Sequence, residues 1–345
     1  MKQFAVLKKE NLDAFISSLA QTQKVVAPVS LGYKNFSFQN VTSAKDIAIR
    51  YIPTILPPKK YFLPTGETLA AYDKGKNSLN AVLEYEKMVI FGVHTCDLAG
   101  IQCLNMVFSD KPKDINYIVR KNKIAIIGLE CNEYCDEYAS CHVVNNHLPN
   151  GGYDLFFTDL GDTFVVHINT MLGDELVDKA GVLKAADDQT LKSLELLRAK
   201  KQEIFKNEVN VRHDALKLLF NRHALQSKVW DELDKRCLAC GNCTNVCPTC
   251  YCFDIIDESN LDLNSGLRYR RWDSCQSEPF AKVAGNENFR QERGQRQRHR
   301  YLRKFRYPVD KYSRYFCTGC GRCSRTCMAD ISLKETINDL AREIK

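Results

Sequence analysis

The chain has 345 residues, 16 of them cysteine, with 44% hydrophobic and 26% charged side chains and a formal net charge of +7. A chain of this length allows two domains and does not need disulfides as its only support, which argues against a secreted disulfide scaffold. The N-terminus has no signal-peptide pattern, and no stretch approaches the ~18 uncharged apolar residues of a membrane helix. We therefore expect a cytoplasmic protein without a membrane span, in which clustered cysteines indicate metal or redox chemistry.

The first part of the chain alternates amphipathic stretches with short apolar runs, a pattern typical of a mixed α/β domain. Residues 11–20 predict a helix and residues 24–29 predict a short strand. Two fully apolar strands are predicted at 88–93 and 123–129, with a helix at 97–108 between them. Apolar strands joined by a crossover helix indicate a parallel βαβ unit.

The next segment predicts a hairpin and two helices. Alternating polarity over residues 153–168 predicts antiparallel strands that turn at Gly161-Asp162. Residues 188–207 and 214–226 predict amphipathic helices, and we place the domain boundary between them, near residue 208.

Eleven of the cysteines lie between residues 237 and 327, mostly in two runs of identical C-x2-C-x2-C-x3-C spacing. Three cysteines two residues apart can wrap one face of an iron–sulfur cube, whereas the fourth ligates the other cluster. Zinc sites use paired C-x2-C knuckles instead. We therefore predict two [4Fe–4S] clusters. The first is held by Cys237, Cys240, Cys243 and Cys327, and the second by Cys317, Cys320, Cys323 and Cys247.

About 70 residues separate the two cysteine runs, from Cys247 to Cys317, so a compact ferredoxin is not expected. The expected fold is an α/β N-terminal domain over residues 1–208, followed by an α-helical dicluster ferredoxin-like domain over residues 209–345.

Several segments carry a resemblance that covers nearly the whole chain. They are Pro57-Pro-Lys-Lys60, Phe91-Gly-Val-His-Thr-Cys-Asp97, Gly152-Tyr-Asp-Leu-Phe-Phe157, Cys247-Pro-Thr-Cys-Tyr-Cys252, Arg270-Arg-Trp-Asp-Ser-Cys275, Ala284-Gly-Asn-Glu-Asn-Phe-Arg290 and Cys320-Gly-Arg-Cys323. The chain resembles the β subunits of cytosolic NAD(P)-linked sulfhydrogenases and the A subunits of anaerobic sulfite reductases. Met328, where the first run has proline, departs from the pattern.

This resemblance implies a non-catalytic electron-transfer subunit of a multi-subunit cytosolic oxidoreductase, with no catalytic residue of its own. It would relay electrons between a flavoprotein subunit that binds FAD, NAD(P) and a [2Fe–2S] cluster and a further redox or catalytic subunit. The complex would be of hydrogenase, sulfite-reductase or electron-bifurcating type.

A further group of cysteines follows the two apolar strands. The carboxyl ends of parallel strands lie at one edge of a sheet, so the residues after 88–93 should meet the residues after 123–129. We predict a third iron–sulfur site there, from Cys96, Cys131, Cys135 and Cys141; reduced structural thiols are the alternative. Substitute ligands at this edge are His94, Asp97, Glu130 and His142, and Cys103 is expected in the core.

Three cysteines, Cys250, Cys252 and Cys275, belong to neither run, and we interpret them mainly as buried structural thiols. The alternatives are that they line the second cluster or hold another metal.

The segment from Arg290 to Arg306 is strongly basic. Two oxidised clusters would bring the net charge from +7 to about +3, and a third would bring it to about +1. We therefore expect these cations to offset cluster charge or to dock a subunit. The open alternatives are an iron–sulfur nucleic-acid-binding regulator, which is the less favoured, and a self-contained iron–sulfur reductase. The sequence contains neither a Rossmann fingerprint nor a P-loop.

Overall fold

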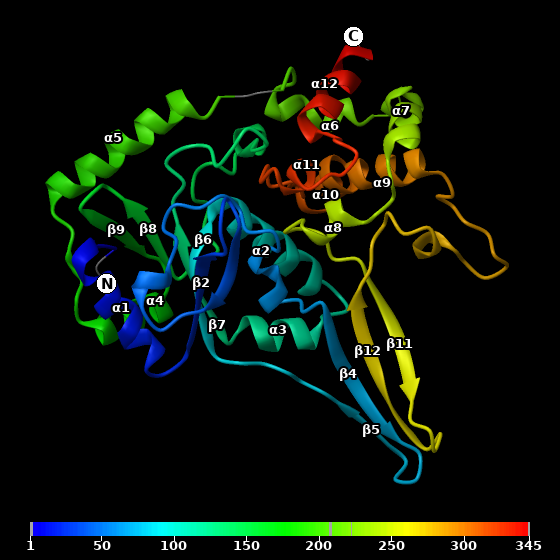
Figure 1. The fold of residues 1–345 in the computed structure, drawn as a ribbon, viewed down its shortest axis with the longest axis horizontal. Coiled ribbons are helices and arrows are strands. Elements are labelled where there is room, and N and C mark those ends of the chain that lie inside the picture. The colour runs from blue at the N-terminus through cyan, green and yellow to red at the C-terminus, as the bar shows by residue number, and fades with distance from the viewer. Residues whose placement is uncertain (1–2, 207–208, 222, 344–345) are drawn as a thin grey trace.

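The computed structural model describes residues 3–206, 209–221 and 223–343, which form two β-sheets and surrounding helices (Figure 1). The strands are β1 (Phe4–Lys8), β2 (Lys24–Ser30), β3 (Phe36–Asn40), β4 (Gly66–Asp73), β5 (Ser78–Ala81), β6 (Met88–His94), β7 (Ile124–Leu129), β8 (Leu155–Asp159), β9 (Thr163–Ile168), β10 (Lys184–Ala185), β11 (Phe253–Ser259) and β12 (Ser265–Trp272).

The helices are α1 (Leu12–Ala20), α2 (Thr95–Phe108), α3 (Ile115–Lys121), α4 (Met171–Ala180), α5 (Asp188–Ile204), α6 (Leu216–Leu219), α7 (Val229–Arg236), α8 (Asn242–Asn245), α9 (Arg293–Phe305), α10 (Tyr307–Tyr312), α11 (Arg322–Arg325) and α12 (Leu333–Glu343). None of the helices in the described part of the chain is long and apolar enough to cross a membrane.

The larger sheet has eight strands in the order β10-β1-β9-β8-β7-β6-β2-β3. Its centre is parallel, with β2, β6, β7 and β8 side by side, and this confirms the predicted βαβ unit of β6, α2 and β7. Every residue of β6 and β7 is buried, which explains their unbroken apolar sequences. Residues of α1 and α4 pack on one face of the sheet, and residues of α2 and α3 pack on the other.

The predicted helix at 11–20 and the predicted hairpin at 153–168 are confirmed as α1 and as β8 with β9. The continuous helix predicted at 214–226 is wrong. In the described residues of this stretch the chain forms a 3-10 turn at His213–Ala215, then the one-turn helix α6, and a separate 3-10 turn at His223–Gln226. Phe220 leaves the helical region, with φ −93° and ψ 36°, and stacks on Phe305 at 5.0 Å between ring centroids. Packing of this ring in the core therefore overrides the helical period of the sequence.

The smaller sheet forms an arm that projects from the body (Figure 1). Its order is β11-β12-β4-β5, so it joins one hairpin from the first 208 residues to one from the rest of the chain. Arg270 of β12 anchors its base, with ion pairs to Glu67 and Asp114. The fold is therefore mixed α/β, and because residues 209–345 contain β11 and β12, the expected purely α-helical character of this region is not confirmed.

A second set of contacts joins the cysteine-rich loops to the carboxyl edge of the parallel strands. Arg322 forms a two-point ion pair with Asp97, with N–O distances of 2.6 and 2.7 Å. The backbone N–H of Ser140 donates to the carbonyl of Gly319 at 2.7 Å. The region predicted to bind clusters is thus packed directly against the sheet edge that carries Cys96 and the 131–141 loop.

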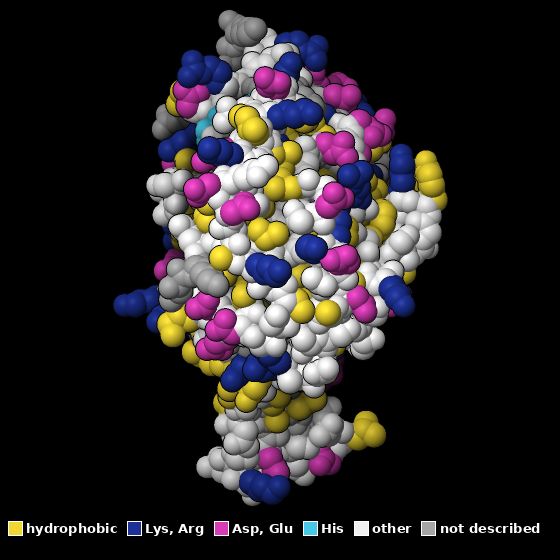
Figure 2. Space-filling model, turned by 90° about the vertical axis from the view of Figure 1, so that its left-hand side faces the viewer, with side chains coloured by type: hydrophobic (Ala, Val, Ile, Leu, Met, Phe, Trp, Pro, Cys, Tyr) yellow, Lys and Arg dark blue, Asp and Glu magenta, His cyan; other side chains and the backbone are white. Residues whose placement is uncertain are grey.

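The surface over the N-terminal sheet has no basic stripe. Figure 2 shows lysine and arginine side chains interspersed with aspartate and glutamate over this face, which narrows below to the arm. The basic residues of segment 290–306 lie elsewhere, on α9 and next to it.

Candidate metal centres

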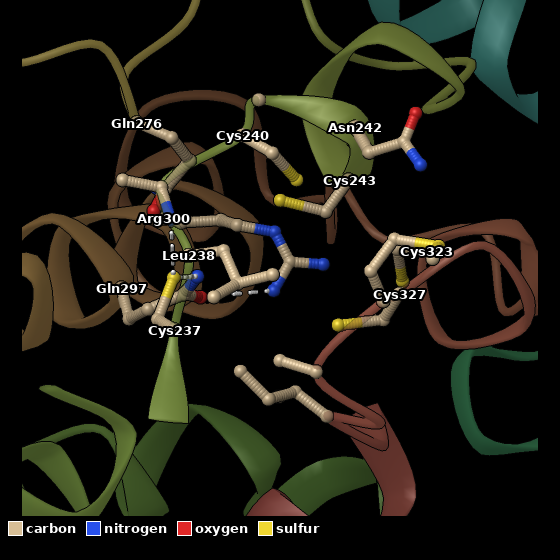
Figure 3. Close-up of a pocket in the computed structure, with 15 residues that line it drawn as sticks. Cys237, Leu238, Cys240, Asn242, Cys243, Gln276, Gln297, Arg300, Cys323 and Cys327 are labelled. Carbon is tan, nitrogen blue, oxygen red and sulfur yellow. Dashed lines mark hydrogen bonds between the residues drawn. The ribbon is translucent and has the colours of Figure 1, made fainter. Parts of the chain in front are cut away.

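One cavity gathers five cysteines from the two motifs. Cys237 and Cys240 line it from the loop between α7 and α8, Cys243 from α8, Cys323 from α11, and Cys327 from the loop after α11 (Figure 3). The loop between α7 and α8 can wind around the cavity because Ala239 and Gly241 have positive φ, at 53° and 75°. Four of the five cysteines, Cys237, Cys240, Cys243 and Cys327, are the set predicted from the spacing for the first cluster.

A second cavity gathers the other predicted set. Cys317 and Cys320 line it from the loop between α10 and α11, Cys323 lines it from α11, and Cys247 comes from the end of the first motif. Cys323 borders both cavities, so the two sites are neighbours. The four cysteines predicted for each cluster thus line one cavity, three from one motif and the last from the other, as expected for a pair of ferredoxin-type clusters; Cys323 borders the first cavity in addition.

Helix α9 places a buried row of cations beside these cavities. Arg296, Arg300 and Lys304 recur every four residues, lie on one face of the helix and are all buried. Arg300 borders both cavities, and in Figure 3 its guanidinium points in among the cysteines of the first. Lys304 borders the second cavity and donates to Thr249 Oγ1 at 2.6 Å. These cations face the sites where cluster charge would accumulate.

The thiols must lose their protons to bind a metal, and their pKa values show how strongly burial opposes this loss. Burial raises the pKa of Cys243 to about 12, with the charge of Arg300 acting against it. Burial also raises the pKa of Cys317 well above its usual value. A metal displaces the proton of a coordinating thiol, so metal binding here would release protons. Four cysteines around each cavity with buried cations alongside form a donor set that fits a [4Fe–4S] cluster.

Protein groups also donate hydrogen bonds to a cysteine sulfur of the first cavity. Gln297 of α9 donates from Nε2 to Cys237 Sγ at 3.0 Å, and the backbone N–H of Ala239 donates to the same sulfur at 3.4 Å. Hydrogen bonds to cluster sulfurs are one of the factors that set the reduction potential. Gln297 was not expected from the sequence. The basic residues of 290–306 include a set that recurs every four residues, and this period indicates that one face of the helix carries a distinct set of polar side chains.

The predicted third site lies at the carboxyl edge of the parallel strands. His94 ends β6, and its ring lies so close to Cys131 and Cys135 that their ligand atoms are all within 4.8 Å of one another. A hydrogen bond from Cys135 to Cys131, together with burial and the charges of neighbouring thiolates, raises the pKa of Cys135; those neighbours include Cys96 and Cys141. The structure thus places two of the four predicted cysteines, Cys131 and Cys135, in one tight group with His94, and Cys96 and Cys141 act on the pKa of Cys135.

The other proposed substitute ligands are differently placed. Asp97 is paired with Arg322, and Glu130 is paired with Lys201 at 2.7 Å, so both carboxylates already have buried partners. His142 lies beside His147, with ring centroids 4.8 Å apart. Cys103 is completely buried on α2, in agreement with its expected place in the core.

Beyond the tight group of His94, Cys131 and Cys135 the sheet edge opens into a broad cavity. Tyr51 stacks on His94 at 3.9 Å between ring centroids. The cationic residues around the cavity are Lys34, Arg50 and Lys200. Burial, the charge of Asp97 and then that of Cys320, which lines the second cavity, raise the pKa of Cys96.

Comparison with known proteins agrees with this arrangement of cysteines. The family model of a 4Fe-4S dicluster domain matches residues 236–331, a range that contains both cysteine runs. The chain is therefore an iron–sulfur protein of the electron-transfer class.

A full-length relative extends the match to the whole chain. The sulfhydrogenase 2 subunit beta of Pyrococcus furiosus is 33% identical over 341 residues, which cover 98% of each chain. The chain belongs to the sulfhydrogenase β-subunit family and is an iron–sulfur electron-transfer subunit of oxidoreductase type.

Proposed function

We propose that this chain holds two [4Fe–4S] clusters in crossed ligand sets and relays single electrons through them. The observation that carries the proposal is the pair of neighbouring cavities, whose linings include three cysteines of one motif and the last cysteine of the other, with Cys323 bordering both. The first set is Cys237, Cys240, Cys243 and Cys327, and the second is Cys317, Cys320, Cys323 and Cys247. When bound, the clusters supply one-electron redox chemistry, and the chain supplies the ligands and the compensating cations.

A third iron–sulfur centre at Cys96, Cys131, Cys135 and Cys141 would extend the relay toward the parallel sheet. Its support is the mutual influence of these thiols and the influence of Cys320 on Cys96. The three sites would then follow one another, with the second cavity between the other two.

Iron content tests both parts of the proposal. Two clusters require about 8 irons per chain and three require about 12, since each cubane holds four. Cys243→Ser should reduce the iron of the first site, Cys135→Ser should reduce that of the third, and Cys103→Ser is the control in the core. A chain that binds iron with neither stoichiometry, or whose iron is unaffected by Cys243→Ser, would refute the assignment.

The partners follow from the family rather than from this chain alone. We propose a cytosolic complex in which a flavoprotein subunit with FAD, NAD(P) and a [2Fe–2S] cluster exchanges electrons with this chain, and a further redox or catalytic subunit completes the reaction. The relative is named as one subunit of a sulfhydrogenase, which supports a multi-subunit assembly. Affinity purification under anaerobic conditions should recover a flavin-containing partner; recovery of the chain alone, loaded with iron, would argue against the complex.

A self-contained reductase is the second candidate, because the cavity beside His94, Cys131 and Cys135 is broad enough to admit a small acceptor; its lining includes three cations, Lys34, Arg50 and Lys200, and three carboxylates, Glu130, Glu133 and Asp159. Turnover of such an acceptor by the isolated chain with an artificial electron donor would support it. A nucleic-acid-binding role has less support, because three of the cations at 290–306 are buried on α9. A gel-shift assay at physiological salt should detect no retained DNA or RNA.

A further inference from the structure

Two cysteines outside the predicted ligand sets, Cys252 and Cys275, flank β11 and β12, the hairpin that leaves the body of the protein (Figure 1). Cys252 directly precedes β11, and Cys275 follows β12 by three residues. The two strands pair from Phe253 with Trp272 onward, and the backbone N–H of Asp273 donates to the carbonyl of Cys252 at 3.0 Å. The register of the hairpin therefore fixes the separation of Cys252 from Cys275 at the base of the arm.

The two thiols form an asymmetric pair. Cys252 is partly exposed, whereas only 6% of Cys275 is exposed. A hydrogen bond from Cys275 to Cys252 lowers the pKa of Cys252, with help from the charges of Arg303 and Lys304 against burial. The same bond, together with burial, raises the pKa of Cys275. An accessible thiol with a lowered pKa beside a buried one with a raised pKa is the usual arrangement of an attacking and a resolving cysteine.

A short polar contact leads from this pair to the first candidate cluster cavity. The side chain of Gln276 donates to Cys275 Sγ at 3.5 Å and itself lines that cavity. Two residues before Cys252, the Sγ of Cys250 accepts from Lys304 at 3.3 Å, and Lys304 lines the second cavity. The pair is thus placed beside the first one-electron centre, and the second centre is the neighbour of the first.

We propose that Cys252 and Cys275 form a dithiol–disulfide pair that exchanges two electrons with the two iron–sulfur centres and reduces low-molecular-weight disulfides. The inference rests on the proposed electron-transfer function and adds a two-electron sulfur site to it. Both cysteines are free thiols in the structure, which corresponds to the reduced form of the pair.

The chemistry balances in two stages. The Cys252 thiolate attacks one sulfur of the small disulfide, the S–S bond breaks, and one thiol leaves. The Cys275 sulfur then attacks Cys252, which releases the second thiol and closes a disulfide between the two cysteines. Two electrons, one from each centre, and two protons from solvent cleave that disulfide and restore both thiols. The net reaction is the reduction of one disulfide to two thiols.

Trapping of the mixed disulfide tests the assignment on the full-length, iron-loaded chain. The chain is incubated anaerobically with hydroxyethyl disulfide, alkylated and analysed by mass spectrometry without reduction, with its iron measured in parallel. The unmodified chain should yield a linkage between Cys252 and Cys275 that dithionite removes. Cys275→Ser should trap the adduct on Cys252, and Cys252→Ser should decrease adduct formation by at least about tenfold. The matched control Cys103→Ser should leave the linkage intact.

Two outcomes would overturn the inference. One is an iron-loaded chain in which no linkage between these cysteines forms and no adduct accumulates on Cys252 in Cys275→Ser. The other is a loss of about four irons in Cys252→Ser or Cys275→Ser, which would make these residues cluster ligands instead. Failure of the proposed function would be distinguishable, because it would appear as missing iron in the unmodified chain.

Discussion

The buried pair of Arg322 with Asp97 joins the second cluster loop to the edge of the parallel sheet, and its disruption should destabilise the protein strongly. Both side chains are completely buried, and two hydrogen bonds of 2.6 and 2.7 Å join them. Arg322 also donates to the carbonyl of Thr54 at 2.6 Å. The substitution Asp97→Asn keeps the shape of the side chain but removes its charge, and so leaves a buried guanidinium without its counter-ion.

The expected cost follows from the burial. Breaking a fully buried pair by removing one partner costs about 3–5 kcal/mol, because the remaining charge stays desolvated. For a chain of 345 residues that corresponds to a fall in Tm of roughly 4–7 °C. The double variant Asp97→Leu with Arg322→Met removes both charges, and it should recover most of the lost stability because neither charge then remains buried alone.

Thermal unfolding followed by circular dichroism under anaerobic conditions measures this effect, at one scan rate for all variants and with iron content determined for each. Arg212→Ala, which breaks an exposed pair with Asp214, is the matched control and should leave Tm unchanged. A fall of less than about 2 °C for Asp97→Asn, or a double variant no more stable than the single one, would refute the reasoning.

Three further predictions concern the cations and the loops. Lys304→Met should lower the reduction potential of the centre in the second cavity by about 50–100 mV in an EPR-monitored titration, because a buried cation that favours the reduced cluster is lost. Burial and two neighbouring arginines lower the pKa of His299 to about 4. This value lies below that of the unfolded chain, so the stability that His299 contributes is lost as pH falls from about 6.5 to 4, and the wild type should lose about 1–2 kcal/mol more than His299→Gln in denaturant unfolding over that range. Gly319→Ala should lower Tm and iron content more than Gly285→Ala does: both glycines have positive φ, but only at Gly319 would the added Cβ meet the backbone of Ser140, at 2.4 Å, whereas nothing lies within 4 Å at Gly285. Equal effects of the two substitutions would contradict the packing argument.

Local sequence patterns were sufficient to predict those strands whose residues are all equally buried. The apolar runs that became β6 and β7 are buried at every residue, so composition alone marked them as central parallel strands. The stretch at 214–226 shows the opposite case. Its apolar spacing is helical, yet the ring of Phe220 gains more by stacking in the core, and a contact with Phe305 that is 85 residues away cannot be read from a local period.

The candidate sites likewise divide into those that follow from a local sequence pattern and those that depend on contacts between distant segments. The spacing of each C-x2-C-x2-C run depends on local loop geometry, and the structure gathers the two predicted sets around two cavities. The arm was not expected, because its sheet forms only when β4 pairs with β12, some 200 residues later. His94 was weighed only as a substitute at the third site, and its closeness to Cys131 and Cys135 arises because β6 and β7 end together.

The buried cations change the meaning of the overall charge. A net charge of +7 suggests an anionic partner only if the cations lie at the surface, but Arg296, Arg300 and Lys304 lie inside, along one face of α9. Burial alone would destabilise these three cations, because each loses its hydration. Burial lowers the pKa of Arg300, but negative charge on Cys243, Cys323, Tyr301 and Cys247 together raises it well above its usual value, so the buried cation depends on negative charge around it. The basic segment and the cysteine runs are therefore one electrostatic unit: cluster charge offsets the desolvation of the cations, and the cations in turn favour the reduced state of the clusters they border.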